Sequence, residues 1–183
     1  TTDDGSYGEK GFTTDKLKEL IEAGNEYEDN GERAIFYARG VLETVKKLRW
    51  RPDVIHCQGW ISAVAPLYIK TAFKDEPSFD GTKVVFEIND VKLKNNLPEN
   101  FNSCLATRNV TKTFLKKENL KFENADDLLK LGIKFSDALI LGTNESNKEV
   151  VDYAESEGKP VLPFVENPDY ASYYGDFYEK LLS

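Results

Sequence analysis

The chain of 183 residues carries 24 basic and 32 acidic side chains, which gives it a formal net charge of -8 at pH 7. An acidic surface repels phosphate backbones and anionic lipid headgroups, so we expect neither a nucleic-acid nor a membrane partner. No window approaches the roughly 18 consecutive apolar residues of a membrane span, and no secretory signal is present, so we expect a cytoplasmic protein.

Residues 1–25 are rich in Gly, Asp, Ser and Thr and predict a mobile N-terminal segment. Three glycines in this segment, Gly5, Gly8 and Gly11, do not predict a phosphate loop, because no apolar strand precedes them. We therefore assign a single domain to residues 26–183. The sequence contains no Met, which indicates a fragment or an incomplete sequence.

Helices and strands alternate in the first half of this domain. Apolar residues recur three and four positions apart from Asn30 to Leu48, the spacing of one helical face. Asp29 and Glu32 resemble a capping box at the start of this helix. Gly59 separates an apolar, β-branched strand from the next helix. The predicted elements are a helix at 30–48, a strand at 53–57, a helix at 60–73 and a strand at 83–88.

The same alternation returns after a polar, Asn-rich interval. It predicts a helix at 126–134, a strand at 137–142, a helix at 146–157 and a strand at 161–165. A last helix at 168–182 places six large side chains on one side, namely Tyr170, Tyr173, Tyr174, Phe177, Tyr178 and Leu181. This pattern favours packing of the helix across the sheet, and a sugar-stacking surface is the alternative.

The order of these elements predicts an α/β fold, a Rossmann-like parallel sheet flanked by helices. Ligands of such open sheets lie beyond the carboxyl ends of the strands, where loops lead into helices. The candidate site therefore lies at three strand exits, residues 56–60, 88–91 and 142–146.

Two adjoining segments resemble the bacterial glycogen and plant starch synthases. The family pattern W-R-P-D-V-V-H-A-H-D-W, followed by a small-residue helix, is matched by Arg51, Pro52, Asp53, Val54, His56, Trp60, Ala63 and Pro66. The preceding segment, Glu32 to Glu43, resembles the E-R-F-A-F-F-S-R-A-A-L-E helix of these enzymes. The resemblance covers residues 26–88 and, in pattern only, residues 126–165. It implies the N-terminal lobe of a GT-B glycosyltransferase, without the C-terminal lobe that holds ADP-glucose.

The chain departs from the family at two positions to which the resemblance assigns catalytic contacts. Gly59 replaces the Asp of the H-D-W motif, and Asn89 replaces the His of the V-H-N motif. Losing one such contact typically costs about 100- to 1000-fold in rate. Asp90 partly restores a polar contact if the register shifts by one residue. The candidate catalytic residues are therefore His56, Asn89 and Asp90, and the candidate sugar-binding residues are these three with Gln58, Gly59 and Trp60.

His56 is the only histidine of the chain. We favour a hydrogen-bonded strand-end residue over a general base, because no Ser or Cys nucleophile can be assigned beside it. One His with two distant cysteines, Cys57 and Cys104, does not form a metal ligand set, and both cysteines are expected to be reduced thiols. We expect no metal and no cofactor.

Two functions are weighed at this stage, and a new enzyme built around His56, Asn89 and Asp90 is a third possibility. The first is a glycogen or starch synthase-like protein of the ADP-glucose:α-1,4-glucan glucosyltransferase family, weak or inactive as this chain alone. The second is a non-catalytic module that binds glucan or another protein. An α-glucan or maltooligosaccharide is the expected ligand, and ADP-glucose would bind only if a donor lobe is supplied elsewhere.

Overall fold

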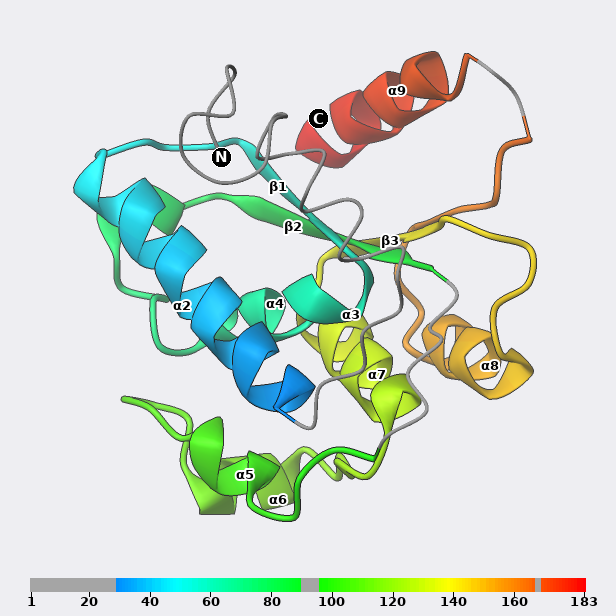
Figure 1. The fold of residues 1–183 in the computed structure, drawn as a ribbon. Helices are drawn as coiled ribbons and strands as arrows, with labels where there is room; N and C mark the ends of the chain where they lie inside the picture. The colour runs from blue at the N-terminus through cyan, green and yellow to red at the C-terminus, as the bar shows by residue number, and fades with distance from the viewer. Residues whose placement is uncertain (1–28, 90–95, 167–168) are drawn as a thin grey trace, which may run out of the picture.

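The computed structural model describes residues 29–89, 96–166 and 169–183, and its centre is a parallel sheet (Figure 1). The strands lie in the order β1-β2-β3-β4, with bounds Val54–Gln58, Lys83–Ile88, Ala138–Leu141 and Val161–Leu162. All three pairings are parallel. The predicted α/β class, a Rossmann-like parallel sheet flanked by helices, is confirmed. The predictions for residues 1–25 and for Asp90 lie outside the described residues.

Helices cover both faces of this sheet (Figure 1). The helical bounds are α2 Asn30–Lys47, α3 Gly59–Ser62, α4 Val64–Lys70, η1 Pro77–Phe79, α5 Phe101–Cys104, α6 Lys112–Lys117, α7 Ala125–Phe135, α8 Lys148–Ser156 and α9 Tyr170–Leu182. Helices α2, α4, α7 and α8 contribute to one large core with the sheet, whereas α9 packs on Val85, Ala138 and Ile140. Because successive strand residues point to opposite faces, the two cores draw on alternate residues of β2 and β3.

The single helix predicted at 60–73 is two short helices, α3 and α4, separated at Ala63. Pro66 explains the break. A proline has no N–H to donate to the carbonyl four residues earlier, which here belongs to Ser62, and its ring crowds that carbonyl. The polar interval also contains two short helices, α5 and α6, which the sequence did not predict.

Helix capping differs from the prediction at α2. Asp29 makes no side-chain cap, and its carboxylate instead accepts a hydrogen bond from Arg33 Nε at 2.8 Å. The predicted capping box with Glu32 is therefore wrong. A reciprocal capping box is found at α7, where Asn124 Oδ1 accepts from the Asp127 N–H at 3.1 Å and Asp127 accepts from the Asn124 N–H at 3.2 Å.

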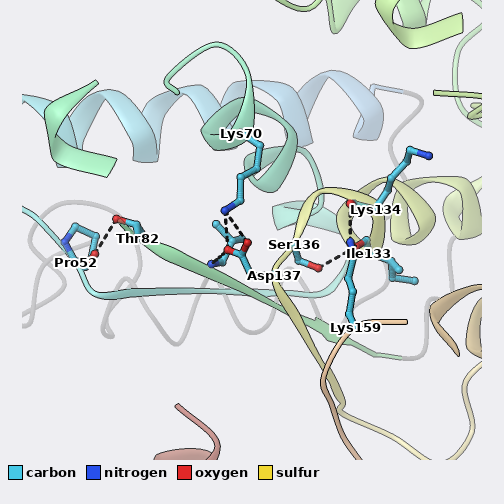
Figure 2. Close-up of polar contacts among 9 residues, drawn as sticks. Pro52, Lys70, Thr82, Ile133, Lys134, Ser136, Asp137 and Lys159 are labelled. Atoms are coloured by element: carbon cyan, nitrogen blue, oxygen red, sulfur yellow. Dashed lines mark hydrogen bonds and ion pairs between the residues drawn. The ribbon is translucent and has the colours of Figure 1, made fainter. Parts of the chain in front are cut away.

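Polar contacts connect the amino ends of the strands, at the end of the sheet opposite the candidate site (Figure 2). Asp137, just before β3, accepts from the Val84 N–H at 2.7 Å and forms an ion pair with Lys70 Nζ at 2.6 Å. Thr82 donates to the Pro52 carbonyl at 2.8 Å. These contacts connect β1, β2, β3 and α4 at the amino end of the sheet.

We expect Asp137→Ala to lower the free energy of unfolding by about 2 kcal/mol, because it leaves the Val84 N–H without its acceptor and removes the partner of Lys70. Asp137→Asn keeps an acceptor oxygen of the same size and should cost less than half as much. Urea denaturation of both variants measures the difference. Equal losses would show that the ion pair, and not the bond to Val84, carries the effect.

Candidate functional site

A cluster of polar side chains lies where β1 and β2 end, on the sheet face covered by α9. Gln58 and Glu87 are paired in the β1–β2 register. Gln58 Nε2 donates to Glu87 Oε1 at 2.8 Å, and His56 Nε2 lies 3.0 Å from Glu87 Oε2. The Glu87 side chain is 5% exposed and that of His56 is 26% exposed. A buried carboxylate is thus held by two neighbours on the adjacent strand.

Helix α9 completes this cluster with two tyrosines. The Tyr174 hydroxyl donates to Glu87 Oε2 at 3.1 Å, and the Tyr178 hydroxyl lies 2.8 Å from His56 Nδ1. The contacts are all satisfied if His56 carries its proton on Nε2, because Nε2 then donates to Glu87 and Nδ1 accepts from Tyr178. Five side chains from three elements form one continuous hydrogen-bond network.

The network favours the ionised form of Glu87. Burial by itself raises the pKa of this carboxyl, but hydrogen bonds from His56, Gln58 and Tyr174 outweigh burial and bring the pKa below its ordinary value of 4.5. Burial and the negative charge of Glu87 raise the pKa of Tyr174 to about 12, and the same causes raise the pKa of Tyr178. Both phenols therefore remain protonated donors at neutral pH.

A pH prediction follows from the lowered pKa of Glu87. A carboxyl whose pKa is lower in the folded state than in the unfolded state stabilises the fold above its unfolded pKa, near 4.5, and loses this contribution as the pH falls through the folded pKa. The gap in unfolding free energy between wild type and Glu87→Gln should therefore stay constant above about pH 5 and shrink below it. Chemical denaturation at a series of pH values measures the gap, and a gap that does not change down to about pH 3 would contradict the prediction.

Gly59 and Asn89 occupy the two positions where the sequence departs from the synthase motifs. Gly59 has a positive φ of 66°, and a Cβ added to it would lie 3.9 Å from Asn89 Nδ2. Asn89 also lies beside Gly142, whose added Cβ would come within 1.9 Å of Asn89 Oδ1 and 2.5 Å of Glu87 Oε1. The three strand exits therefore converge, and Gly142 must stay a glycine for Glu87 and Asn89 to occupy their positions.

The remaining predicted residue, Trp60, has a structural place. It lies in α3, half-buried, and packs against the large core and not in the polar network. The structure thus joins His56 with Gln58 through Glu87 and places Asn89 beside Gly59.

Sequence reasoning missed Glu87 as a site residue. It placed Gly142 at a strand exit, and Tyr174 and Tyr178 on a helix face with sugar stacking as the alternative role, but it did not bring the two tyrosines to the strand ends. One signal was available for Glu87, because it is the only acidic residue within a strand whose other residues after Lys83 are apolar. A charge in such a strand requires partners, since an unpaired buried charge is costly. No local signal indicated that α9 supplies them.

The Cys57 thiol is not reactive, and no metal site is found in the described part of the chain. Cys57 is buried, and burial raises the pKa of its thiol to about 12, which keeps it protonated and unreactive. No group of three His, Cys, Asp or Glu side chains that could hold a metal ion occurs among the described residues. Within the same residues, no helix is both long and apolar enough to cross a bilayer.

Residues 12–162 match the family model of the starch synthase catalytic domain. The chain belongs to this family. It is 31% identical over 124 residues to the glycogen synthase of Desulforudis audaxviator, a match that covers 68% of this chain and 24% of that protein. It is 39% identical over 92 residues to the glycogen synthase of Chlorobium luteolum, covering 50% of this chain and 19% of that protein.

A longer match links the chain to the glycogen synthase of Chlorobaculum parvum, at 29% identity over 152 residues, which are 82% of this chain and 30% of that protein. The chain thus spans less than a third of the length of these relatives. No solved structure gives a significant match. The starch synthase family membership confirms the resemblance found in the sequence, and the match ends before α9 begins at Tyr170.

Proposed function

We propose that this chain is the glucan-facing part of a glycogen or starch synthase-like glucosyltransferase, and that it is weak or inactive alone in transferring glucose from ADP-glucose to an α-1,4-glucan. Family membership and the glycogen synthase relatives support the reaction class. In the resemblance, the positions of Gly59 and Asn89 hold the Asp and the His that contact the sugars. This chain is therefore either a pseudoenzyme or a protein that needs a partner for activity.

The observation that carries this proposal is the state of the polar groups at the strand ends. Transfer of a glucosyl group needs acceptors and fixed charge placed around the anomeric centre. Glu87 is the carboxylate at this place, and hydrogen bonds from Gln58 and Tyr174, with the contact to His56, occupy it. Gly59 offers no side chain. The strand ends of this chain are therefore better suited to hold a sugar than to transfer one.

A non-catalytic interaction module is the second candidate, and a surface of α2 favours it. Five of the large hydrophobic residues exposed in the described structure lie on α2 or directly after it, and the two most exposed are Phe36 at 81% and Leu48 at 70%. Several large apolar side chains exposed on one element are typical of protein-binding surfaces.

We propose α-glucan as the ligand of the strand-end site, and ADP-glucose only where a donor lobe is supplied by another part or another chain. Both cysteines, Cys57 and Cys104, are unpaired, as expected in a reducing compartment, and we propose a cytoplasmic location.

Isothermal titration with maltoheptaose and, separately, with ADP-glucose tests this proposal. We expect binding of maltoheptaose, no binding of ADP-glucose, and no transfer of labelled glucose from ADP-glucose to glycogen by the chain alone. Lys117→Ala, a change at an exposed residue at the end of α6, is the control and should bind maltoheptaose as wild type does. Rapid glucosyl transfer would overturn the proposed inactivity. If the folded protein binds neither ligand, the interaction module is favoured.

A further inference from the structure

Helix α9 is the least anchored helix that the structure describes. It has 13 residues, and none of them is buried, whereas every other described helix contains at least one buried residue. Its apolar contact with the sheet is made by Tyr174, Phe177, Tyr178 and Leu181. Elements with few buried contacts detach at a lower free energy than the rest of a protein.

The polar contacts of α9 fall on the candidate sugar site. The Tyr174 hydroxyl donates to Glu87 Oε2 at 3.1 Å, and the Tyr178 hydroxyl lies 2.8 Å from His56 Nδ1. A carboxylate oxygen and an imidazole nitrogen are the acceptors that a sugar hydroxyl also uses, since both accept an O–H bond. While α9 is docked, the tyrosines occupy the positions that sugar hydroxyls would take.

The docked position is also the resting position. Val85, Ala138 and Ile140 are fully buried in the small core that α9 helps to form, so detachment exposes apolar surface. A ligand that displaces α9 must provide the free energy of this detachment. Its apparent dissociation constant is then raised by the inverse of the fraction of molecules in which α9 is detached.

We propose that α9 is a removable cap that competes with an α-glucan chain for His56 and Glu87. This inference rests on the proposed function, because it takes the glucan as the ligand. The cap accounts for two tyrosine hydroxyls directed at the strand ends by a helix that lies outside the family match.

Removing the two hydroxyls tests the cap without removing the helix. Tyr174→Phe with Tyr178→Phe keeps both rings and their apolar packing and deletes only the two O–H groups. We expect faster amide hydrogen exchange across residues 170–182 and about 30-fold tighter binding of maltoheptaose than in wild type, because the two lost bonds together weaken the docked state by about 2 kcal/mol. Tyr173→Phe, which changes an exposed tyrosine on the same helix, should match wild type in both measurements.

The outcomes separate the cap from the function. Faster exchange in α9 with unchanged or weaker binding overturns the cap and leaves the glucan site standing. No binding by wild type and by the double variant, with α9 shown to be detached by exchange, overturns the proposed glucan site and the cap together.

Discussion

Glu87→Ala is expected to lower the free energy of unfolding by about 3 kcal/mol, because it removes the acceptor shared by three donors. His56 Nε2, the Gln58 amide and the Tyr174 hydroxyl all lie within 3.1 Å of the Glu87 carboxylate. A donor left without a partner costs about 1 to 3 kcal/mol when it is buried, and less where water reaches it, as it does at His56 and Gln58, which are exposed residues of β1. The change also weakens the docking of α9, since Tyr174 is one of its two polar anchors.

Urea denaturation followed by tryptophan fluorescence measures this loss. Glu87→Gln keeps the size and one acceptor oxygen, so we expect it to lose about half as much as Glu87→Ala. Glu155→Ala removes an exposed carboxylate on α8 and should change stability by less than about 0.5 kcal/mol. A Glu87→Ala protein as stable as wild type would show that the network stabilises nothing and that Glu87 is held for another reason.

The fold could be predicted from the sequence because its signals are local. Alternating apolar strands and amphipathic helices lie close to their predicted bounds, as β2 at Lys83–Ile88 and α7 at Ala125–Phe135 illustrate. The errors have local causes. Pro66 divides a continuous apolar run into two helices, and the side chain of Asp29 pairs with Arg33 instead of capping α2.

The candidate site could be predicted only in part. Motif positions identified His56, Gln58, Gly59 and Asn89, and three of these meet around Glu87 and Gly142. The two contacts that bring α9 into the network join residues far apart in the sequence. Tyr174 is 87 positions from Glu87, and Tyr178 is 122 positions from His56. The aromatic pattern of α9 correctly predicted that this helix packs on the sheet. Of the six side chains expected there, four do so, namely Tyr174, Phe177, Tyr178 and Leu181, whereas Tyr170 and Tyr173 are exposed. A helical pattern does not state where along the sheet the helix lies.

The site depends on the core behind it, because neighbouring residues of β2 serve the two faces of the sheet. Phe86 is fully buried on the face of α7, and Glu87 points to the face of α9. Gly132 of α7 lies against the Phe86 ring, since a Cβ added to this glycine would come within 2.6 Å of two ring carbons. The glycine thus lets α7 approach the sheet closely, and the ring fills the space between them.

Phe86→Ala is therefore expected to lower the free energy of unfolding by about 4 kcal/mol, the usual cost of emptying a buried aromatic site. Gly132→Ala alone should cost about 2 kcal/mol, because crowding of the ring outweighs the better helix propensity of alanine. In the double variant the new methyl group enters the space that the ring has left, so the loss should be at least 1 kcal/mol smaller than the sum of the single losses. Chemical denaturation of the four proteins measures this coupling. Additive losses would mean that atoms other than the Phe86 ring crowd the new methyl group at position 132, and would contradict the role assigned to this contact.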